Sequence, residues 1–113
     1  MDITNLLKEF NGAITITDKA GVITYMNDKS IKTFMDDGGE KLLGQNVLDC
    51  HPEPSRSKLA ELMNKEITNV YTIEKNGKKK LVYQSPLYEN GNYKGFIELT
   101  LEIPFEMPHF VRG

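Results

Sequence analysis

The sequence predicts an α+β domain built on one five-stranded antiparallel sheet, with short helices covering one face and a further helix at the N-terminus. Segments rich in β-branched and aromatic residues lie toward both ends of the chain, separated by turns that contain Gly and Asn. The middle, residues 28–66, instead carries apolar residues at helical spacing, interrupted by Gly and Pro. With 113 residues, the chain fits a single domain.

The N-terminal part predicts one helix and a β-hairpin. Apolar residues at helical spacing predict a short amphipathic helix over residues 3–10. Alternation with period two predicts a strand over residues 13–17, and a second β-rich run predicts a strand over residues 22–26. Residues 18–21 between them are typical of a tight turn, so the two strands form a hairpin.

The rest of the chain predicts a helical insert and three more strands. The longest helix of the insert is expected over residues 55–65. Its apolar side carries Leu59, Leu62 and Met63, and its polar side carries Arg56, Lys58, Glu61 and Lys65. The three strands are expected over residues 69–75, 79–88 and 93–103, joined by turns at residues 76–77 and 89–92.

Composition and charge exclude several classes of protein. Apolar residues make up 39% and charged residues 27% of the chain, which is typical of a folded globular domain. The net charge of −2 gives no electrostatic attraction for nucleic acid, and a single Cys excludes an internal disulfide. No apolar run reaches the ~20 residues of a membrane helix, and the N-terminus has no signal-like pattern. We therefore expect a cytoplasmic protein.

Three motifs, in this order along the chain, resemble those of PAS domains. Residues 16–27 resemble the opening PAS hairpin, in which a strand ends in Asp, turns through Gly and continues into a strand that ends near an aromatic residue and Asn. Residues 42–47 resemble the Leu-Gly step between two helices, and residues 90–97 resemble the final hairpin. The resemblance divides the chain into a flanking helix (1–12), a PAS domain (13–104) and a short tail (105–113).

The resemblance carries expectations about fold and function. It implies a helical insert folded over one face of a five-stranded antiparallel sheet, with a ligand cavity between them. PAS domains act as sensors and dimerisation modules in signalling and in the regulation of transcription, and are seldom enzymes. The step Cys50-His51-Pro52 is similar to one in a PAS group that occurs beside hemerythrin-like domains.

The last strand has two chemically different faces, and two registers are open. One face is aliphatic (Ile97, Leu99, Leu101 and Ile103), and the other carries Phe96, Glu98, Thr100 and Glu102. The direct interpretation buries the aliphatic row. The resemblance implies the reverse, with these residues facing the cavity: Thr15, Thr17, Val82, Gln84, Glu98 and Thr100. We favour the reverse because the N-terminal amphipathic helix needs an apolar surface to cover, in its own subunit or in a partner's.

This register predicts a polar cavity that suits a small polar molecule. Glu98 inside it needs a partner, such as Tyr25, Tyr83 or a cationic ligand. Besides the polar row, the expected ligand-facing residues are Tyr25, Asn27, Cys50, His51, Leu59 and Phe96. The alternative places Glu98 at a solvated rim and fills the cavity with protein side chains, leaving no room for a ligand.

Cys50 and His51 are the candidates for a haem or redox site. A thiolate or an imidazole can hold haem iron, but adjacent residues rarely bind one metal together. We favour a structural role, with Cys50 as a small buried residue and His51 capping the next helix. The resemblance puts Leu59 where oxygen-sensing haem PAS domains carry their proximal His. It puts Val47 where flavin-binding PAS domains carry Cys, which argues against a flavin adduct. Oxidation sensing by Cys50 stays a third interpretation.

We therefore expect a sensor or protein-interaction domain that binds a small ligand of unspecified identity and signals as a homodimer or through a partner protein. Membranes and nucleic acids are not expected as direct partners. The alternatives are a haem or redox sensor that uses Cys50 or His51, a ligand-free dimerisation module, and a small proton-transfer enzyme. The chain shows no Ser-His-Asp set, phosphate-binding loop or metal-spaced His cluster, so we expect no enzymatic activity.

Overall fold

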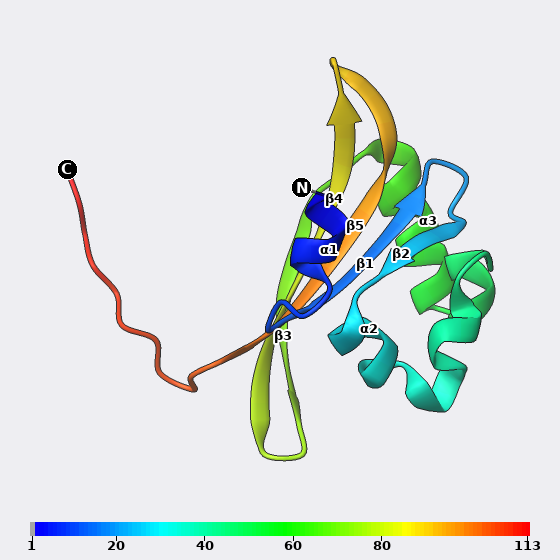
Figure 1. Cartoon of the computed structure of the whole chain (residues 1–113). Helices are drawn as coiled ribbons and strands as arrows, with labels where there is room; N and C mark the ends of the chain where they lie inside the picture. The colour runs from blue at the N-terminus through cyan, green and yellow to red at the C-terminus, as the bar shows by residue number, and fades with distance from the viewer. Residues whose placement is uncertain (1) are drawn as a thin grey trace.

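A computed structural model describes residues 2–113 of the chain (Figure 1). The elements are α1 (Ile3–Leu7), β1 (Ala13–Asp18), β2 (Ile23–Met26), α2 (Asp28–Thr33), the 3-10 helices η1 (Met35–Asp37), η2 (Gly39–Leu42) and η3 (Val47–Cys50), then α3 (Ser55–Lys65), β3 (Asn69–Lys75), β4 (Lys78–Glu89) and β5 (Asn92–Ile103). The predicted α+β class with one five-stranded sheet is confirmed.

The sheet is antiparallel throughout, with strand order β2-β1-β5-β4-β3. The hairpins β1–β2 and β3–β4–β5 form because tight turns separate consecutive strands. The last strand then pairs with the first and joins the two halves. The helical segment between β2 and β3 must therefore cross from one edge of the sheet to the other. It does so over a single face (Figure 1).

Two apolar clusters hold the helical layer on the sheet. In the first, Leu59, Leu62 and Met63 of α3 pack around Phe96 of β5. The second consists of Ile23 and Met26 of β2 with Leu42 of η2, and Ile31, Phe34 and Val47 pack against it. Both clusters lie toward the ends of the helical layer, which leaves space between them over the middle of the sheet.

The register of β5 is the one implied by the resemblance. Phe96, Glu98 and Thr100 face the helical layer and line the space beneath it. The aliphatic row of the same strand therefore faces the other way, and α1 lies against that outer face (Figure 1). A methyl group placed on Gly12 would lie 2.4 Å from Leu101 Cδ2 and 2.8 Å from Phe10 Cε2, so these two side chains meet over Gly12 on that face.

The predicted helix over residues 3–10 is shorter than expected and ends at Leu7. The chain tightens after Leu7, because the Phe10 N–H donates to the Leu7 carbonyl at 3.1 Å instead of to Leu6, as an α-helix would require. The carbonyls at the end of the shortened helix bind the β2–α2 junction: the Leu7 carbonyl also accepts from Asn27 Nδ2 at 3.2 Å, and the Lys8 carbonyl accepts from the Asp28 N–H at 3.0 Å. Tertiary hydrogen bonds thus satisfy the C-terminal carbonyls of α1.

Beyond β5, the chain extends away from the sheet (Figure 1). Phe105, Met107, Phe110 and Val111 of this segment are exposed. Over residues 2–113, no helix combines the length and the apolar character needed to cross a membrane.

Candidate functional site

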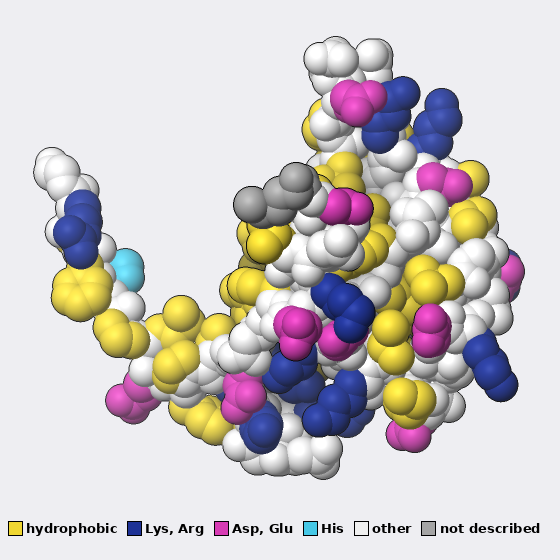
Figure 2. All heavy atoms as spheres, in the orientation of Figure 1, with side chains coloured by type: hydrophobic (Ala, Val, Ile, Leu, Met, Phe, Trp, Pro, Cys, Tyr) yellow, Lys and Arg dark blue, Asp and Glu magenta, His cyan; other side chains and the backbone are white. Residues whose placement is uncertain are grey.

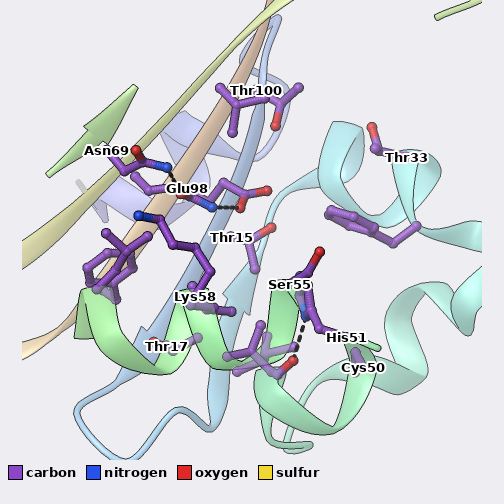
Figure 3. Close-up of a pocket in the computed structure, with 18 of the residues that line it drawn as sticks. Thr15, Thr17, Thr33, Cys50, His51, Ser55, Lys58, Asn69, Glu98 and Thr100 are labelled. Atoms are coloured by element: carbon purple, nitrogen blue, oxygen red, sulfur yellow. Dashed lines mark hydrogen bonds between the residues drawn. The ribbon is translucent and has the colours of Figure 1, made fainter. Parts of the chain in front are cut away.

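A cavity of about 620 Å³ lies between the sheet and the helical layer (Figure 3). This volume is within the range of small-molecule sites in proteins. Its wall on the helical side is mainly apolar, and its floor is the inner face of the sheet. Apolar residues that line it include Phe34, Val47, Leu59, Leu62, Met63 and Val82.

A row of polar side chains crosses the floor of the cavity. Asn69, Gln84 and Glu98 stand opposite one another on β3, β4 and β5, and Thr15 of β1 stands opposite Glu98. Asn69 Nδ2 donates a hydrogen bond to Gln84 Oε1 at 3.0 Å, and Gln84 Nε2 donates one to Glu98 Oε2 at 2.8 Å (Figure 3). The network orients the carboxylate of Glu98 and occupies one of its two oxygens, leaving the other as an acceptor.

Two threonines of β1 add hydroxyl groups to the floor. Thr15 Oγ1 is paired with Ser30 Oγ of α2, which links the sheet to the helical layer. Thr17 is 6% exposed, and its hydroxyl is buried with no hydrogen-bond partner among the described residues. A buried hydroxyl without a partner is uncommon, and a bound molecule or ordered water would satisfy it.

Charged groups line the cavity from both layers. Lys75 and Lys80 of the sheet and Asp37 of η1 contribute to the lining. Lys58 of α3 lines the cavity too, and its side chain extends toward the sheet on the side of Asn69 (Figure 3). Lys58 is exposed, as expected for the polar side of the helix. It lies at the edge of the apolar stripe, one helical turn before Leu62, so its long side chain still reaches the cavity.

His51 is bound to the turn before it. Its Nδ1 lies 2.8 Å from the carbonyl oxygen of Val47, which can only accept, so Nδ1 carries the proton and Nε2 of the neutral ring keeps a free lone pair. The expectation that His51 caps the helix after Pro54 is wrong, because the ring caps the end of η3 instead. At the start of α3, the Glu53 carboxylate accepts a hydrogen bond from the Ser57 N–H at 3.0 Å.

Cys50 also borders the cavity, but it is exposed, so its expected role as a buried apolar residue is wrong. Partial desolvation, and then the neighbouring carboxylates of Asp49 and Asp37, raise the pKa of its thiol. A raised pKa keeps the thiol protonated at neutral pH and lowers its reactivity, since the thiolate is the reactive form. This environment does not favour oxidation sensing.

Most of the sequence-predicted site residues come together at this cavity. Its lining includes Thr17, Cys50, His51, Leu59, Val82, Gln84, Phe96, Glu98 and Thr100. Whether they contact a ligand stays a prediction.

Tyr25 and Asn27 are the two exceptions, which corrects the expectation for both. Tyr25 pairs with Ile16 and points to the outer face, where its hydroxyl donates to the Thr4 carbonyl at 3.1 Å. Asn27 is fully buried and caps α2, so all its polar atoms bind the backbone.

Asn69 is one of the floor residues that sequence reasoning missed, together with Tyr71 and Ile73 on the same strand. The signal was present, because the Asn76-Gly77 turn sets the register of the β3–β4 hairpin. Counting back from the pair Lys75–Lys78 places Asn69 opposite Gln84.

The structure shows no candidate metal site within residues 2–113, where no group of three or more His, Cys, Asp or Glu side chains is arranged to hold an ion.

The comparisons with known proteins show the fold. No protein-family model and no curated protein sequence matches the chain. Among solved structures, it is similar to a sensory box sensor histidine kinase from Vibrio cholerae (TM-score 0.65, 18% identity, 92% of this chain and 90% of that one). It is also similar to the PAS domain of BvgS from Bordetella pertussis (TM-score 0.65, 18% identity, 90% and 84%). A third similar structure is the Aer2 receptor of Vibrio cholerae, described as a dual PAS-heme oxygen sensor (TM-score 0.64, 16% identity, 82% and 95%).

Proposed function

We propose that this chain, whose fold is that of PAS domains, is a sensory domain that binds a small molecule between its sheet and its helical layer. The polar floor of the cavity carries the proposal. A hydrogen-bonded row ends on Glu98, and the Thr17 hydroxyl beside it is buried without a partner among the described residues. A bound polar molecule would supply a partner for the buried Thr17 hydroxyl and a donor for the free oxygen of Glu98, both of which are otherwise left to water.

Ligand binding would act on the rest of the domain by a shift between two states. The Thr15–Ser30 contact joins the cavity floor to α2, and Thr15 lies on β1, whose outer face supports α1. A ligand that favours one arrangement of this contact over the other by about 1–3 kcal/mol would change the surface that a partner meets. The proposal is therefore a sensor that passes its signal to another copy or another protein.

The first test is a thermal-shift screen of metabolites on the wild-type chain and on Thr100→Phe. Phenylalanine at position 100 projects into the cavity and fills space that a ligand needs. A compound present at about 100 times its Kd should stabilise the wild type by about 2.7 kcal/mol and leave Thr100→Phe unchanged.

The matched control is Leu99→Phe, one residue earlier and on the outer face, which should respond like the wild type. A stabilising compound that acts equally on Thr100→Phe would place its site elsewhere and contradict the proposal.

The outer face supports the proposed homodimer. Around α1, Ile3, Leu6 and Phe10 are exposed, and Val70 and Tyr83 lie exposed on the same face of the sheet. Figure 2 shows hydrophobic side chains over this region and along the C-terminal segment. An apolar surface of this kind is typical of a protein–protein contact.

Leu6→Asp is expected to convert the dimer to monomers in sedimentation, because it places a charge in that contact. Leu6 is 61% exposed in the single chain, so the variant should still fold. Met35→Asp, at an equally exposed apolar residue on η1, should leave the dimer intact. A wild-type chain that sediments as a monomer at all concentrations would contradict the homodimer.

A haem-binding function is the second candidate, and the geometry of His51 favours it. The Val47 carbonyl fixes the ring so that Nε2 keeps its lone pair, the state in which imidazole binds iron. His51 would hold the haem as its axial ligand, and haem would supply the chemistry of binding a diatomic gas.

If haem binds, reconstituted protein should show a Soret band that is lost in His51→Ala and retained in Cys50→Ala. A colourless protein after reconstitution would exclude this candidate.

A further inference from the structure

Two opposite charges face the cavity from opposite walls. Glu98 lines the cavity from β5, and Lys58 lines it from α3, with its side chain directed toward the sheet near Asn69 (Figure 3). Among the described residues, neither takes part in an ion pair within 4.0 Å; the four pairs found are Lys8–Asp28, Arg56–Asp49, Lys65–Glu61 and Lys78–Glu102. Glu98 and Lys58 therefore offer an anionic and a cationic group from opposite sides of the cavity, and both are available to a ligand.

The surroundings of Glu98 favour an ammonium group as its partner. Oε2 is held by Gln84 Nε2, which Asn69 fixes in turn, so the other oxygen is oriented and available. The neighbouring polar groups of the floor, Thr17 and Thr100, are neutral hydroxyls. A half-buried carboxylate that has one neutral donor gains most from a cationic donor.

The surroundings of Lys58 favour a carboxylate. Lysine offers three donors and no acceptor, and Lys75 and Lys80 line the same cavity and add positive charge to it. Asp37 is the one further carboxylate of the lining. Three lysines thus line the cavity against two carboxylates, which favours a ligand that brings a carboxylate of its own.

Between the two charges, the cavity offers an extensive apolar surface. Leu59, Leu62 and Met63 line one side and Phe96 the other, in the cluster that joins α3 to the sheet. The cavity of about 620 Å³ is larger than two charged groups alone require. A bulky apolar group on the ligand would fill the remaining space and contact these side chains, which are already buried.

We infer that the cavity binds a zwitterion with a large apolar group, as in an aromatic α-amino acid. Its ammonium group would bind Glu98, its carboxylate would bind Lys58, and its ring would lie against Leu59 and Phe96. The inference rests on the proposed function, whose cavity it uses, and adds the chemical class of the ligand.

The chain contains no Trp, so indole fluorescence reports only an added probe. Three probes share the ring and differ in charge: tryptophan has both groups, tryptamine lacks the carboxylate, and indole-3-propionate lacks the amine. Tryptophan should bind at least about tenfold more tightly than either of the others, because each charged hydrogen bond contributes about 1.5–3 kcal/mol.

Two variants assign the charges. Glu98→Gln should weaken tryptophan and tryptamine by about tenfold and leave indole-3-propionate unchanged. Lys58→Met should weaken tryptophan and indole-3-propionate and leave tryptamine unchanged. Lys65→Met on the same helix and Glu102→Gln on the same strand are the controls, and both should bind all three probes like the wild type. Melting curves of each variant confirm that it is folded.

Three results would overturn the inference: equal affinity for the three probes, an unchanged affinity for tryptophan in Glu98→Gln, or no binding of any probe. The last result is also what an internal Lys58–Glu98 pair would give. The metabolite screen distinguishes this failure from a failure of the proposed function. If the probes do not bind but a screened compound stabilises the wild type and not Thr100→Phe, the proposed function holds and the cavity binds a ligand of another chemical class.

Discussion

Replacing Asn27 with leucine is expected to lower the free energy of unfolding by about 4 kcal/mol. Asn27 is 0% exposed, and its side chain makes four hydrogen bonds to the backbone. Oδ1 accepts from the N–H groups of Ile14 (2.9 Å) and Ser30 (3.1 Å), and Nδ2 donates to the carbonyls of Leu7 (3.2 Å) and Gly12 (2.8 Å). Leucine leaves these four groups without a partner at the junction of α1, β1 and α2.

Urea unfolding followed by circular dichroism measures this effect. Asn64→Leu, at an exposed position of α3, is the control and should change the stability by less than about 0.5 kcal/mol. A loss below about 1 kcal/mol for Asn27→Leu would show that the junction does not depend on this side chain.

Gly95→Ala is the second substitution with a large expected effect, a loss of about 3 kcal/mol. A Cβ atom at position 95 would lie 2.1 Å from the Thr17 carbonyl oxygen and 3.2 Å from the Thr17 carbonyl carbon. Both contacts are with backbone, so β1 and β5 must separate where Asp18 pairs with Gly95. Because Thr17 also faces the cavity, the separation should weaken ligand binding.

The same unfolding measurement tests this prediction, with Lys94→Ala as the exposed neighbouring control. A stability of Gly95→Ala equal to that of the control would mean that the two strands can move apart without cost, which would contradict the close β1–β5 packing.

Elements with strong local signals could be predicted closely from the sequence. The bounds of α3 and β3 match the predicted ranges 55–65 and 69–75, because helical periodicity and a tight hairpin turn are local properties. For β5, strand alternation left two possible rows of cavity-facing residues. The row was predicted once we chose which face of the sheet the N-terminal helix lies on. That choice rested on the amphipathic N-terminal helix, which lies on the outer side of the sheet but is too short to cover it.

The segment of residues 43–54 could not be predicted in the same way, because its shape depends on distant backbone contacts. Val22 bridges to Asn46, the Ile23 N–H binds the Gln45 carbonyl, and the Val47 N–H binds the Gly21 carbonyl. These bonds attach the segment to the β1–β2 turn and to β2, and so determine where Cys50 and His51 point. No residue pattern within the segment encodes that attachment.

Asn27 shows the limit of reasoning from a motif. Its place after an aromatic strand end made it a candidate ligand contact, but a residue that ends a strand and begins a helix uses its side chain to cap that helix. A polar residue at such a junction is therefore better interpreted as structural until its hydrogen bonds are known.

Methyl-resolved NMR can show directly whether a small molecule binds between the sheet and the helical layer, by titration with the compound that stabilises the wild type most. Binding there should give saturable shifts of the methyl groups of Leu59, Leu62, Met63 and Val82, with those of Leu6, Leu99 and Leu101 on the outer face nearly unchanged. Shifts confined to the outer face would mean that the ligand site does not lie between the two layers.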